Sequence, residues 1–419
     1  MTATPAGLEF HKGFTQFSGV ERQVCHSEPM GRGDGGSRWT DALLDRMRGI
    51  GDPVADESVA AVLDRGGVAA VNDVMHTLVR ANQPAPESLP AELREYLTTT
   101  LPLPDWADPD KIRRGQQLFE TWGLYISVCL FCCSLPSAYA AADGVQVLHM
   151  TMRLDTDARR RVMETGQFLI DVLSVDGLED NGTGRRTIQR VRLMHAAVRH
   201  LIEARREQDP EMWNPDWGTP INQEDLAGTM LSFSDIVAGP LPKLGVRVPR
   251  EDAEAYLHLW NVIAHLLGLR EEMRVHDLAD AGELVEAIKR RHFRASPEGR
   301  EMTAALLDLL DELTPTHGFD ATIPPLVRYL VGKDTADLLD VPPSGLVDDA
   351  ERIGGLARLL YRAVIGDADH DPLRYDLITA IVRPFGRELM SRLFALERGG
   401  DRAQFDIPDH LAARWELSR

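Results

Sequence analysis

The sequence predicts an all-α protein, built as one large helical domain. Three observations favour this class. Helix-forming residues such as Ala, Leu, Arg and Glu are abundant, apolar residues recur at helical spacing, and no convincing strand pattern of alternating apolar and polar residues is present. Aromatic residues, which strands prefer, make up only 6% of the 419 residues. With no sequence repeat in the chain, a single α-helical unit of unusual size is the simplest architecture.

Composition and charge limit the possible partners. The 43% of hydrophobic residues are enough for a globular core. The 46 basic residues against 65 acidic residues give a net charge of −19, which is opposite to the charge of a phosphate-binding surface. We therefore do not expect nucleic acid to be a partner.

Cysteine usage and the apolar runs predict a cytoplasmic protein. Three of the four cysteines, Cys129, Cys132 and Cys133, share one apolar run, which is not how a disulfide framework is spread. The run itself, Trp122–Leu135, is shorter than the roughly 20 residues of a membrane span, so we expect a buried core helix and no transmembrane segment. The N-terminus lacks the basic and apolar regions of a secretion signal.

The helical patterns define the expected elements and three regions. Residues 1–100 read as an N-terminal extension and helical cap, residues 101–400 as the main domain, and residues 401–419 as a tail packed on it. After short helices within Thr40–Ala81, the predicted helices are Lys111–Trp122, Thr156–Val175, Arg185–Arg206, one beginning near Glu224, Glu251–Leu269, Leu284–Arg291, Pro297–Leu313, Pro325–Leu339, Asp348–Val364 and Leu373–Leu396. The Asp-Pro-Asp ending at Asp110 and the later Asn222 are expected helix caps.

Helix Arg185–Arg206 carries a histidine within an apolar stripe. At helical period one face is formed by Ile188, Val191, His195, Val198 and Ile202. Arg192 and Arg199 lie three residues before and four residues after the histidine, so they flank it by one turn on either side. Imidazole is a common axial ligand of haem iron, and arginine binds carboxylates such as the haem propionates. On spacing alone, a core histidine beside two surface arginines remains the alternative.

Other motifs do not supply a complete site. The C-x-x-C-C at Cys129–Cys133 lacks the fourth ligand of a zinc site and the histidine of a covalent haem motif, which favours inert buried thiols. Gly31–Gly36 matches a dinucleotide-binding pattern, but no strand precedes it. Small residues in Ser137–Gly144 predict a close approach of two backbones, or of a backbone and a cofactor.

Histidines elsewhere in the chain do not form a convincing metal site. Two Glu/His pairs, one ending at His258 and one at His276, are one residue too long for the Glu-x-x-His spacing of di-iron bundles. His258 and His265 are expected to be core histidines beside Trp260. The sequence also lacks the G-x-S-x-G, H-E-x-x-H and Walker patterns, which removes the commonest hydrolase, zincin and nucleotidase interpretations.

Five segments together resemble one family. They are VRLMHAAVRH, SLPSAYAAADG, INQEDLAGTMLSFS, EAYLHLWNVIAHLLG and LVRYLVGKDTADLLDVP. They are similar to the latex-clearing protein (rubber oxygenase) family, a superfamily that includes oxygenases cutting terpenoid side chains, and the resemblance spans roughly residues 100–400. It implies haem b on a globin-like helical core.

The resemblance also implies roles for individual residues. His195 matches the proximal ligand of the haem iron, and Arg192 and Arg199 match propionate partners. Arg328 matches a third propionate contact. On the distal helix, Arg161 and Thr165 match polar positions.

The chain departs from the rubber-cleaving members in the distal region. Glu164 stands where they carry a lysine before the threonine, and no acid occurs at Gly144–Val147, where their distal glutamate is expected, except the neighbouring Asp143. We therefore expect a haem oxygenase that uses O2 and a soluble, apolar, isoprenoid-like small molecule rather than solid polyisoprene, with Glu164 as the distal acid or base. A non-catalytic carrier of haem or of a lipophilic ligand on the same fold is the alternative, and a metal-independent helical scaffold is the third.

Overall fold

The structure, a computed structural model, describes residues 37–63, 87, 89–151, 157–244, 246–313 and 323–343. Every described helix belongs to one unit of the chain, which begins at Trp39. Among the described residues there is no β-strand, and the single isolated bridge joins Ala141 to Phe293. The prediction of an all-α fold is confirmed. The helices predicted after residue 343, the tail 401–419 and the Gly31–Gly36 pattern lie outside the described residues.

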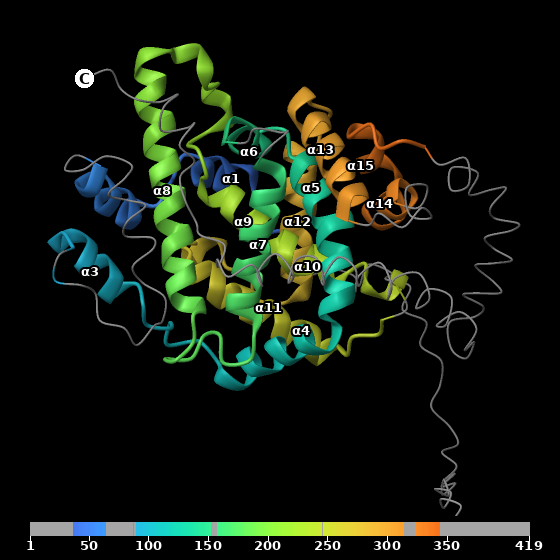
Figure 1. Cartoon of the computed structure of the whole chain (residues 1–419), viewed down its shortest axis with the longest axis horizontal. Helices are drawn as coiled ribbons and strands as arrows, with labels where there is room; N and C mark the ends of the chain where they lie inside the picture. The colour runs from blue at the N-terminus through green and yellow to red at the C-terminus, as the bar shows by residue number, and fades with distance from the viewer. Residues whose placement is uncertain are drawn as a thin grey trace, which may run out of the picture. The chain divides into compact units, whose positions relative to one another are not determined.

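The helices follow one another with short connections. They are α1 (Asp41–Arg48), a helix at 53–63, α3 (Ala91–Thr99), α4 (Pro109–Cys129), a π-helical turn η1 (Leu130–Ser134), α5 (Leu135–Ala140), α6 (Val145–Thr151), α7 (Asp157–Leu173), α8 (Gly184–Gln208), α9 (Gln223–Phe233), α10 (Asp235–Ala238), α11 (Arg250–Leu266), α12 (Leu278–His292), α13 (Pro297–Leu313), α14 (Ile323–Val331) and α15 (Lys333–Leu338). Figure 1 shows α8 on one side of the bundle and α4 and α5 on the other, with α7, α9 and α11 between them.

Two of these helices begin at the predicted capping residues. The Asp108 side chain accepts hydrogen bonds from the backbone N–H groups of Asp110 and Lys111 at 2.9 and 3.2 Å and starts α4. The Asn222 side chain accepts a hydrogen bond from the N–H of Asp225 at 2.9 Å and starts α9. Because the cap fixes the first turn of α9, it also fixes where the acidic side chains of that turn point.

The helix predicted at Lys111–Trp122 is much longer in the structure. It continues through η1 into α5, although Pro136 lies in its path. Proline has no N–H, and its ring conflicts with the carbonyl four residues earlier. The wider π turn, in which the N–H of Leu135 bonds to the carbonyl of Leu130, accommodates the proline without ending the helix.

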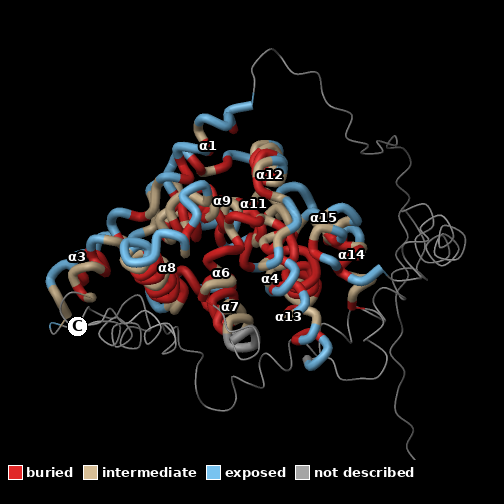
Figure 2. Tube along the Cα trace, turned by 90° about the horizontal axis from the view of Figure 1, so that it is seen from above, coloured by how far each residue is buried: buried red, intermediate tan, exposed pale blue. Residues whose placement is uncertain are grey.

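The continuous helix Pro109–Ala140 is long and apolar enough to cross a membrane by length and composition, but 61% of its apolar window is buried inside the protein. It packs along α11. The predicted core helix is therefore present, as a longer element. In the view of Figure 2, buried residues gather along the inner parts of the helices, whereas exposed residues follow the connections and the outer turns.

The N-terminal helices pack onto α8. Buried apolar residues of 53–63 and α3, such as Val59 and Leu93, form one cluster with Leu193, Ala197 and Leu201 of α8. The remaining helices form the main core, which includes the fully buried side chains of Trp260, Ile126 and Leu173. Because α8 lies between the two clusters, it is buried along much of its length.

The small-residue run Ser137–Gly144 brings two backbones close together, as predicted. The N–H of Ala142 donates to the carbonyl of His292 at 3.0 Å, and the N–H of Arg294 donates to the carbonyl of Ala140 at 3.1 Å. The isolated bridge therefore ties the end of α5 to the end of α12. This tie places the end of α12 beside the cavity described below.

Candidate active site

A cavity of about 1250 Å³, including its open mouth, lies between α5, α6, α8, α9 and α12. Apolar side chains form most of its lining: Ala138, Ala141, Val147, Leu148, Met194, Val198, Ile221, Leu226, Leu231, Ile236, Val285, Ile288 and Phe293. Its polar lining includes His195 from α8 and an acidic and histidine group from α9 and α12. An apolar cavity with a few polar groups is typical of a site for a small molecule or cofactor.

His195 lines this cavity from the middle of α8. Burial lowers the pKa of His195 to about 4, and the positive charges of Arg199 and Arg161 add to this effect. The imidazole is therefore neutral at physiological pH. Its ring nitrogens have no hydrogen-bond partner within the described residues, so the lone pair of one of them is available to a ligand in the cavity.

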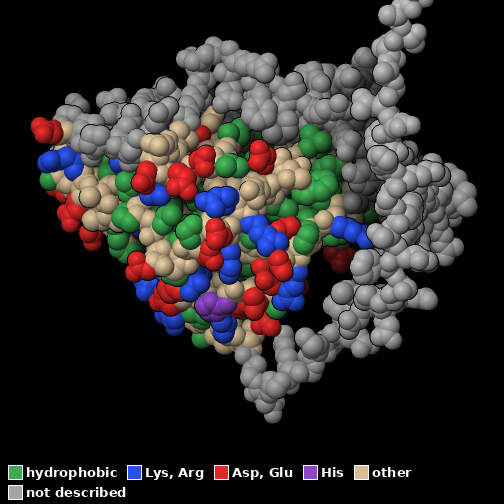
Figure 3. Space-filling model, turned by 90° about the horizontal axis from the view of Figure 1, so that it is seen from below, with side chains coloured by type: hydrophobic (Ala, Val, Ile, Leu, Met, Phe, Trp, Pro, Cys, Tyr) green, Lys and Arg blue, Asp and Glu red, His purple; other side chains and the backbone are tan. Residues whose placement is uncertain are grey.

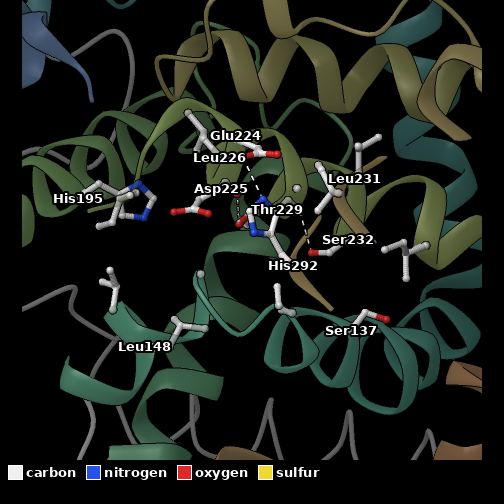
Figure 4. A pocket seen from close by; sticks show the side chains of 18 of the residues that line it. Ser137, Leu148, His195, Glu224, Asp225, Leu226, Thr229, Leu231, Ser232 and His292 are labelled. Carbon is white, nitrogen blue, oxygen red and sulfur yellow. Dashed lines mark hydrogen bonds and ion pairs between the residues drawn. The ribbon is translucent and has the colours of Figure 1, made fainter. Parts of the chain in front are cut away.

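A network of charged residues lies at another wall of the cavity, where Glu224, Asp225 and His292 belong to the lining and Arg48 and Asp143 bind them from behind it. His292 lies between two carboxylates: its Nδ1 is 2.9 Å from Asp143 Oδ2, and its Nε2 is 3.1 Å from Glu224 Oε2. Arg48 donates from Nη1 to Glu224 at 3.3 Å and to Asp225 at 3.0 Å. Figure 4 shows Glu224 and His292 joined on this wall, His195 at another side of the cavity, and the Asp225 side chain between them in this view.

The network sets the charge of its members. Burial opposes the charged form of His292, but its hydrogen bonds to Asp143 and Glu224 outweigh burial and raise its pKa. At Glu224, the hydrogen bond to His292 and the positive charges of His292, Arg48 and Arg291 outweigh burial and lower the pKa. Burial raises the pKa of Asp225, against the opposing effect of Arg48. The wall is thus a set of paired charges rather than an excess of one sign.

Only one of the two histidines in the cavity can act as a metal ligand. Metal ligation requires a neutral imidazole with an available nitrogen. Both ring nitrogens of His292 are held by carboxylates, and its charged form is favoured. His195 is neutral, and its ring nitrogens have no hydrogen-bond partner among the described residues, so its imidazole has the form that metal ligation requires.

The predicted arginine partners are buried and already paired. Arg192 and Arg199 are only 9% and 4% exposed. The alternative interpretation, a core histidine beside two surface arginines, is therefore wrong about the arginines. Arg192 binds Asp52 through two hydrogen bonds of 2.5 and 2.8 Å. Arg199 pairs with Asp56 and donates to the carbonyls of Pro220 and Ile221. Neither arginine lies in the cavity lining.

Arg328, the third predicted propionate partner, lies on α14. It donates to the carbonyl of Val341 at 2.8 Å and to Asp337 at 2.5 Å. It does not line the cavity either. The structure therefore brings none of the three predicted arginines to the cavity wall, and their contact with a cofactor stays a prediction.

The residues predicted on the distal helix are only partly brought to the cavity. Arg161 of α7 lines it and donates to the Thr151 hydroxyl at 3.1 Å. Glu164 is buried and Thr165 half-buried one turn further along α7, outside the cavity lining. Their chemical roles stay predictions.

Comparison with known proteins places the chain in a family. Residues 120–369 match the model described as "ER-bound oxygenase mpaB/B'/Rubber oxygenase, catalytic domain". A rubber oxygenase of Streptomyces sp. (strain K30) is 32% identical over 298 residues, which are 69% of this chain and 70% of that protein. The structure of latex clearing protein LCP in the closed state aligns with a TM-score of 0.70 and 28% identity, covering 86% of this chain and 95% of that chain.

The chain belongs to this oxygenase family. The match confirms the resemblance inferred from the sequence. All seven predicted site residues, from Arg161 to Arg328, lie inside the matched range 120–369. Arg48, Asp52 and Asp56, which contact the site helices, lie outside it.

The other sequence candidates have structural roles in this oxygenase. Cys129, Cys132 and Cys133 are free and buried, and burial raises the pKa of each thiol, to about 11 for Cys133. They are inert thiols, as predicted. The described residues contain no group of three or more His, Cys, Asp or Glu that could hold a metal ion.

His258 and His265 are half-buried, but their aromatic neighbour is Trp106 rather than the predicted Trp260. The Trp106 ring lies 5.8 and 5.7 Å from the two imidazoles, edge to face. His258 also accepts a hydrogen bond from the N–H of Asp108 at 2.9 Å. The prediction failed because Trp260 faces the opposite side of α11, where it stacks on Phe233.

Sequence reasoning missed the charged wall, because its members come from four distant segments. Two signals were present. The segment INQEDLAG places two acids two and three residues after a capping asparagine, and a histidine interrupts the basic run Lys289–Arg294. Figure 3 shows acidic and basic side chains interspersed on one outer face of the molecule. The outer charges on this face therefore do not mark the position of the buried network.

Proposed function

We propose that this protein is a haem b-dependent oxygenase that acts on a soluble, apolar small molecule. The observation that carries the proposal is the neutral imidazole of His195, which has no hydrogen-bond partner in the described part of the chain and lines a largely apolar cavity, in a chain of the rubber-oxygenase family. A non-catalytic carrier would use the same imidazole, and turnover distinguishes the two.

The residues present fit a haem better than a bare metal ion. A bare ion needs several protein ligands, and the described residues offer no such group. A porphyrin brings four ligands of its own and requires one axial imidazole and apolar walls. His195 and the apolar lining supply both. When bound, the haem iron supplies the redox chemistry with O2.

The protein's own residues hold the cofactor and exclude water. His195 would ligate the iron, and Arg192, Arg199 and Arg328 are the proposed partners of the propionates. On α7, Arg161 lines the cavity, and Glu164 and Thr165 follow it as proposed acid–base and polar groups of the reaction. The apolar walls would keep bulk water from the reacting centre.

The proposed substrate class rests on the cavity lining and on the departures in sequence. Apolar walls favour a hydrophobic, isoprenoid-like molecule. Glu164 in place of the lysine argues against cleavage of solid polyisoprene. We place the reaction in the cytoplasm, from the reduced cysteines.

Haem reconstitution tests the proposal. The purified protein is titrated with haemin, and the Soret band and dissociation constant are measured for the wild type, for His195→Ala and for the control His200→Ala. His200 lies on the same helix but outside the cavity lining. We expect binding in the wild type and the control, and its loss in His195→Ala. A wild type without a Soret band, or a His195→Ala variant that binds like the control, would overturn the proposal.

Oxygenase and carrier are then separated by O2 uptake. The reduced holoprotein is supplied with a panel of soluble terpenoids, and oxygen consumption is recorded. An oxygenase consumes O2 only with a substrate present. No consumption with any member of the panel would favour the carrier.

A further inference from the structure

The segment Arg48–Asp56, which we call the strap, crosses from the charged wall of the cavity to the helix that carries His195. It joins α1 to the helix at 53–63. Its backbone is tied to the start of α9: the N–H of Thr219 donates to Arg48 O at 2.9 Å, the N–H of Gln223 donates to Ile50 O at 3.0 Å, and Gln223 Nε2 donates to Gly51 O at 2.8 Å. Three hydrogen bonds therefore hold the backbone of the strap beside the start of α9.

Three charged side chains of the strap reach three points of the site. Arg48 pairs with the carboxylates of Glu224 and Asp225 in the first turn of α9. Asp52 holds Arg192 through two hydrogen bonds. Asp56 pairs with Arg199.

The two arginine contacts bracket the predicted iron ligand. Arg192 lies three residues before His195 and Arg199 four residues after it, so the pairs hold α8 about one turn on either side of the imidazole. Two anchors on the same side of a helix resist rotation about its axis. Such a rotation would turn His195 out of the cavity.

Glycines stand at three points where the strap and its neighbours approach closely. A Cβ on Gly51 would lie 2.7 Å from Arg199 Nε, and a Cβ on Gly218 would lie 2.6 Å from the carbonyl of Arg48. A Cβ on Gly268 would lie 2.4 Å from a carboxylate oxygen of Asp52. Gly218 and Gly268 also have positive φ angles of 77° and 94°, which other residues rarely adopt. The close packing of the strap therefore depends on glycines at three separate positions of the chain.

We propose that the strap is a positioning element of the haem site: Asp52 and Asp56 fix the rotation of α8 and with it the direction of His195, while Arg48 fixes the carboxylates of α9. This inference rests on the proposed haem site. It extends the site to a segment outside the matched catalytic range 120–369. Buried ion pairs are weak stabilisers, because desolvation offsets most of their attraction. Orientation is therefore the role that accounts for two such pairs around one histidine.

The test compares three full-length variants, Asp52→Asn, Asp56→Asn and the control Asp171→Asn. Asp171 is also a buried carboxylate bound to α8, through the Thr187 hydroxyl at 2.6 Å, but its contact lies about two turns before His195. Asp56 is one-third exposed, so its variant is the milder one if Asp52→Asn folds poorly. Each variant keeps the size of the side chain and removes the charge.

The first readout is the ferric haem. Partners that orient a metal ligand typically contribute 10- to 100-fold in affinity. We expect Asp52→Asn and Asp56→Asn to weaken haem binding by about tenfold or more and to change the electron paramagnetic resonance spectrum of the ferric iron, which reports the axial ligand. The control keeps both. Affinity and spectrum within twofold of the wild type in both strap variants, or an equal change in the control, would overturn the proposal.

The second readout does not need haem, and so separates the failure of this inference from the failure of the proposed function. Hydrogen exchange is followed in the apoprotein by mass spectrometry. In both strap variants, we expect faster exchange of the backbone amides around His195 on α8 than in the control. Unchanged exchange there would overturn the positioning role of the strap, even if the wild type binds haem. Faster exchange in variants of a protein that binds no haem would support the positioning role and overturn only the proposed haem site.

Discussion

Replacing Asp143 by Asn removes a charge that two cationic groups share behind the wall of the cavity. Asp143 Oδ2 lies 2.9 Å from His292 Nδ1 and 3.2 Å from Arg294 Nη1. Burial alone would raise the pKa of this carboxyl, but the hydrogen bonds to His292 and Arg294 outweigh burial and lower the pKa to about 2. Asp143→Asn therefore removes a carboxylate that is more stable as an ion in the folded protein than in the unfolded chain.

The size of the effect follows from this pKa. The shift of the pKa from its ordinary value of 3.8 to about 2 corresponds to about 2 kcal/mol. We expect a loss of about 1–2 kcal/mol in the free energy of unfolding, because Arg294 is half exposed and water screens its charge. Since the folded pKa is the lower one, this stability is present above pH 3.8 and is lost as the pH falls toward 2.

Urea unfolding at two pH values checks the prediction, with the fluorescence of the buried Trp213 and Trp260 as signal. At about pH 5, Asp143→Asn should be less stable than the wild type by the full amount, and at about pH 3 by roughly half of it. The control is Asp45→Asn, an exposed carboxylate paired with Arg291, which should stay within about 0.5 kcal/mol of the wild type. An equal loss at both pH values, or a loss no larger than that of the control, would refute the reasoning.

Three further predictions use other parts of the chain. Gly282→Ala on α12, where a Cβ meets no atom within 4 Å, should stabilise the protein by about 0.5–1 kcal/mol in urea unfolding, whereas Gly268→Ala, at a φ of 94°, should destabilise it. Iodoacetamide at neutral pH should leave Cys132 and Cys133 unmodified in the native protein and label both after unfolding, because burial raises the pKa of both thiols; labelling of the native protein would contradict this. Glu164→Gln should keep the Soret band and lose turnover, and unchanged turnover would remove Glu164 from the mechanism.

Local patterns predicted the parts of the fold that depend on neighbouring residues. Asp108 and Asn222 cap helices because a cap needs only the next three residues of the chain. On the predicted stripe of α8, Ile188, Val191, Val198 and Ile202 are buried, and His195 is half-buried where this stripe reaches the cavity. Pro136 shows the limit of such reasoning. It marked the end of an apolar run in sequence, but the π turn that carries the helix past it is a response to packing that no propensity encodes.

Long-range pairing decided the parts of the site that the sequence did not predict. The sequence correctly placed Arg192 and Arg199 on either side of His195 along the helix. It did not predict their partners, because a buried guanidinium can pair with a carboxylate from any segment that the fold brings near it. Here Asp52 and Asp56 come from a segment more than a hundred residues earlier. Helical spacing gives the side of the helix on which a charge lies, and it does not give the partner.

The two roles of Arg192, as an anchor for the strap and as a proposed partner of a propionate, make opposite predictions for one variant. A guanidinium has five N–H donors, and Arg192 uses Nε and Nη2 for Asp52 and Nη1 for the carbonyl of Leu266. Donor capacity therefore remains for a second acceptor. If Asp52 and a propionate compete for this cation, Asp52→Asn releases it and haem binds more tightly. If Asp52 instead holds Arg192 so that His195 faces the cavity, the same variant binds haem more weakly, so the sign of the change in affinity separates competition from positioning.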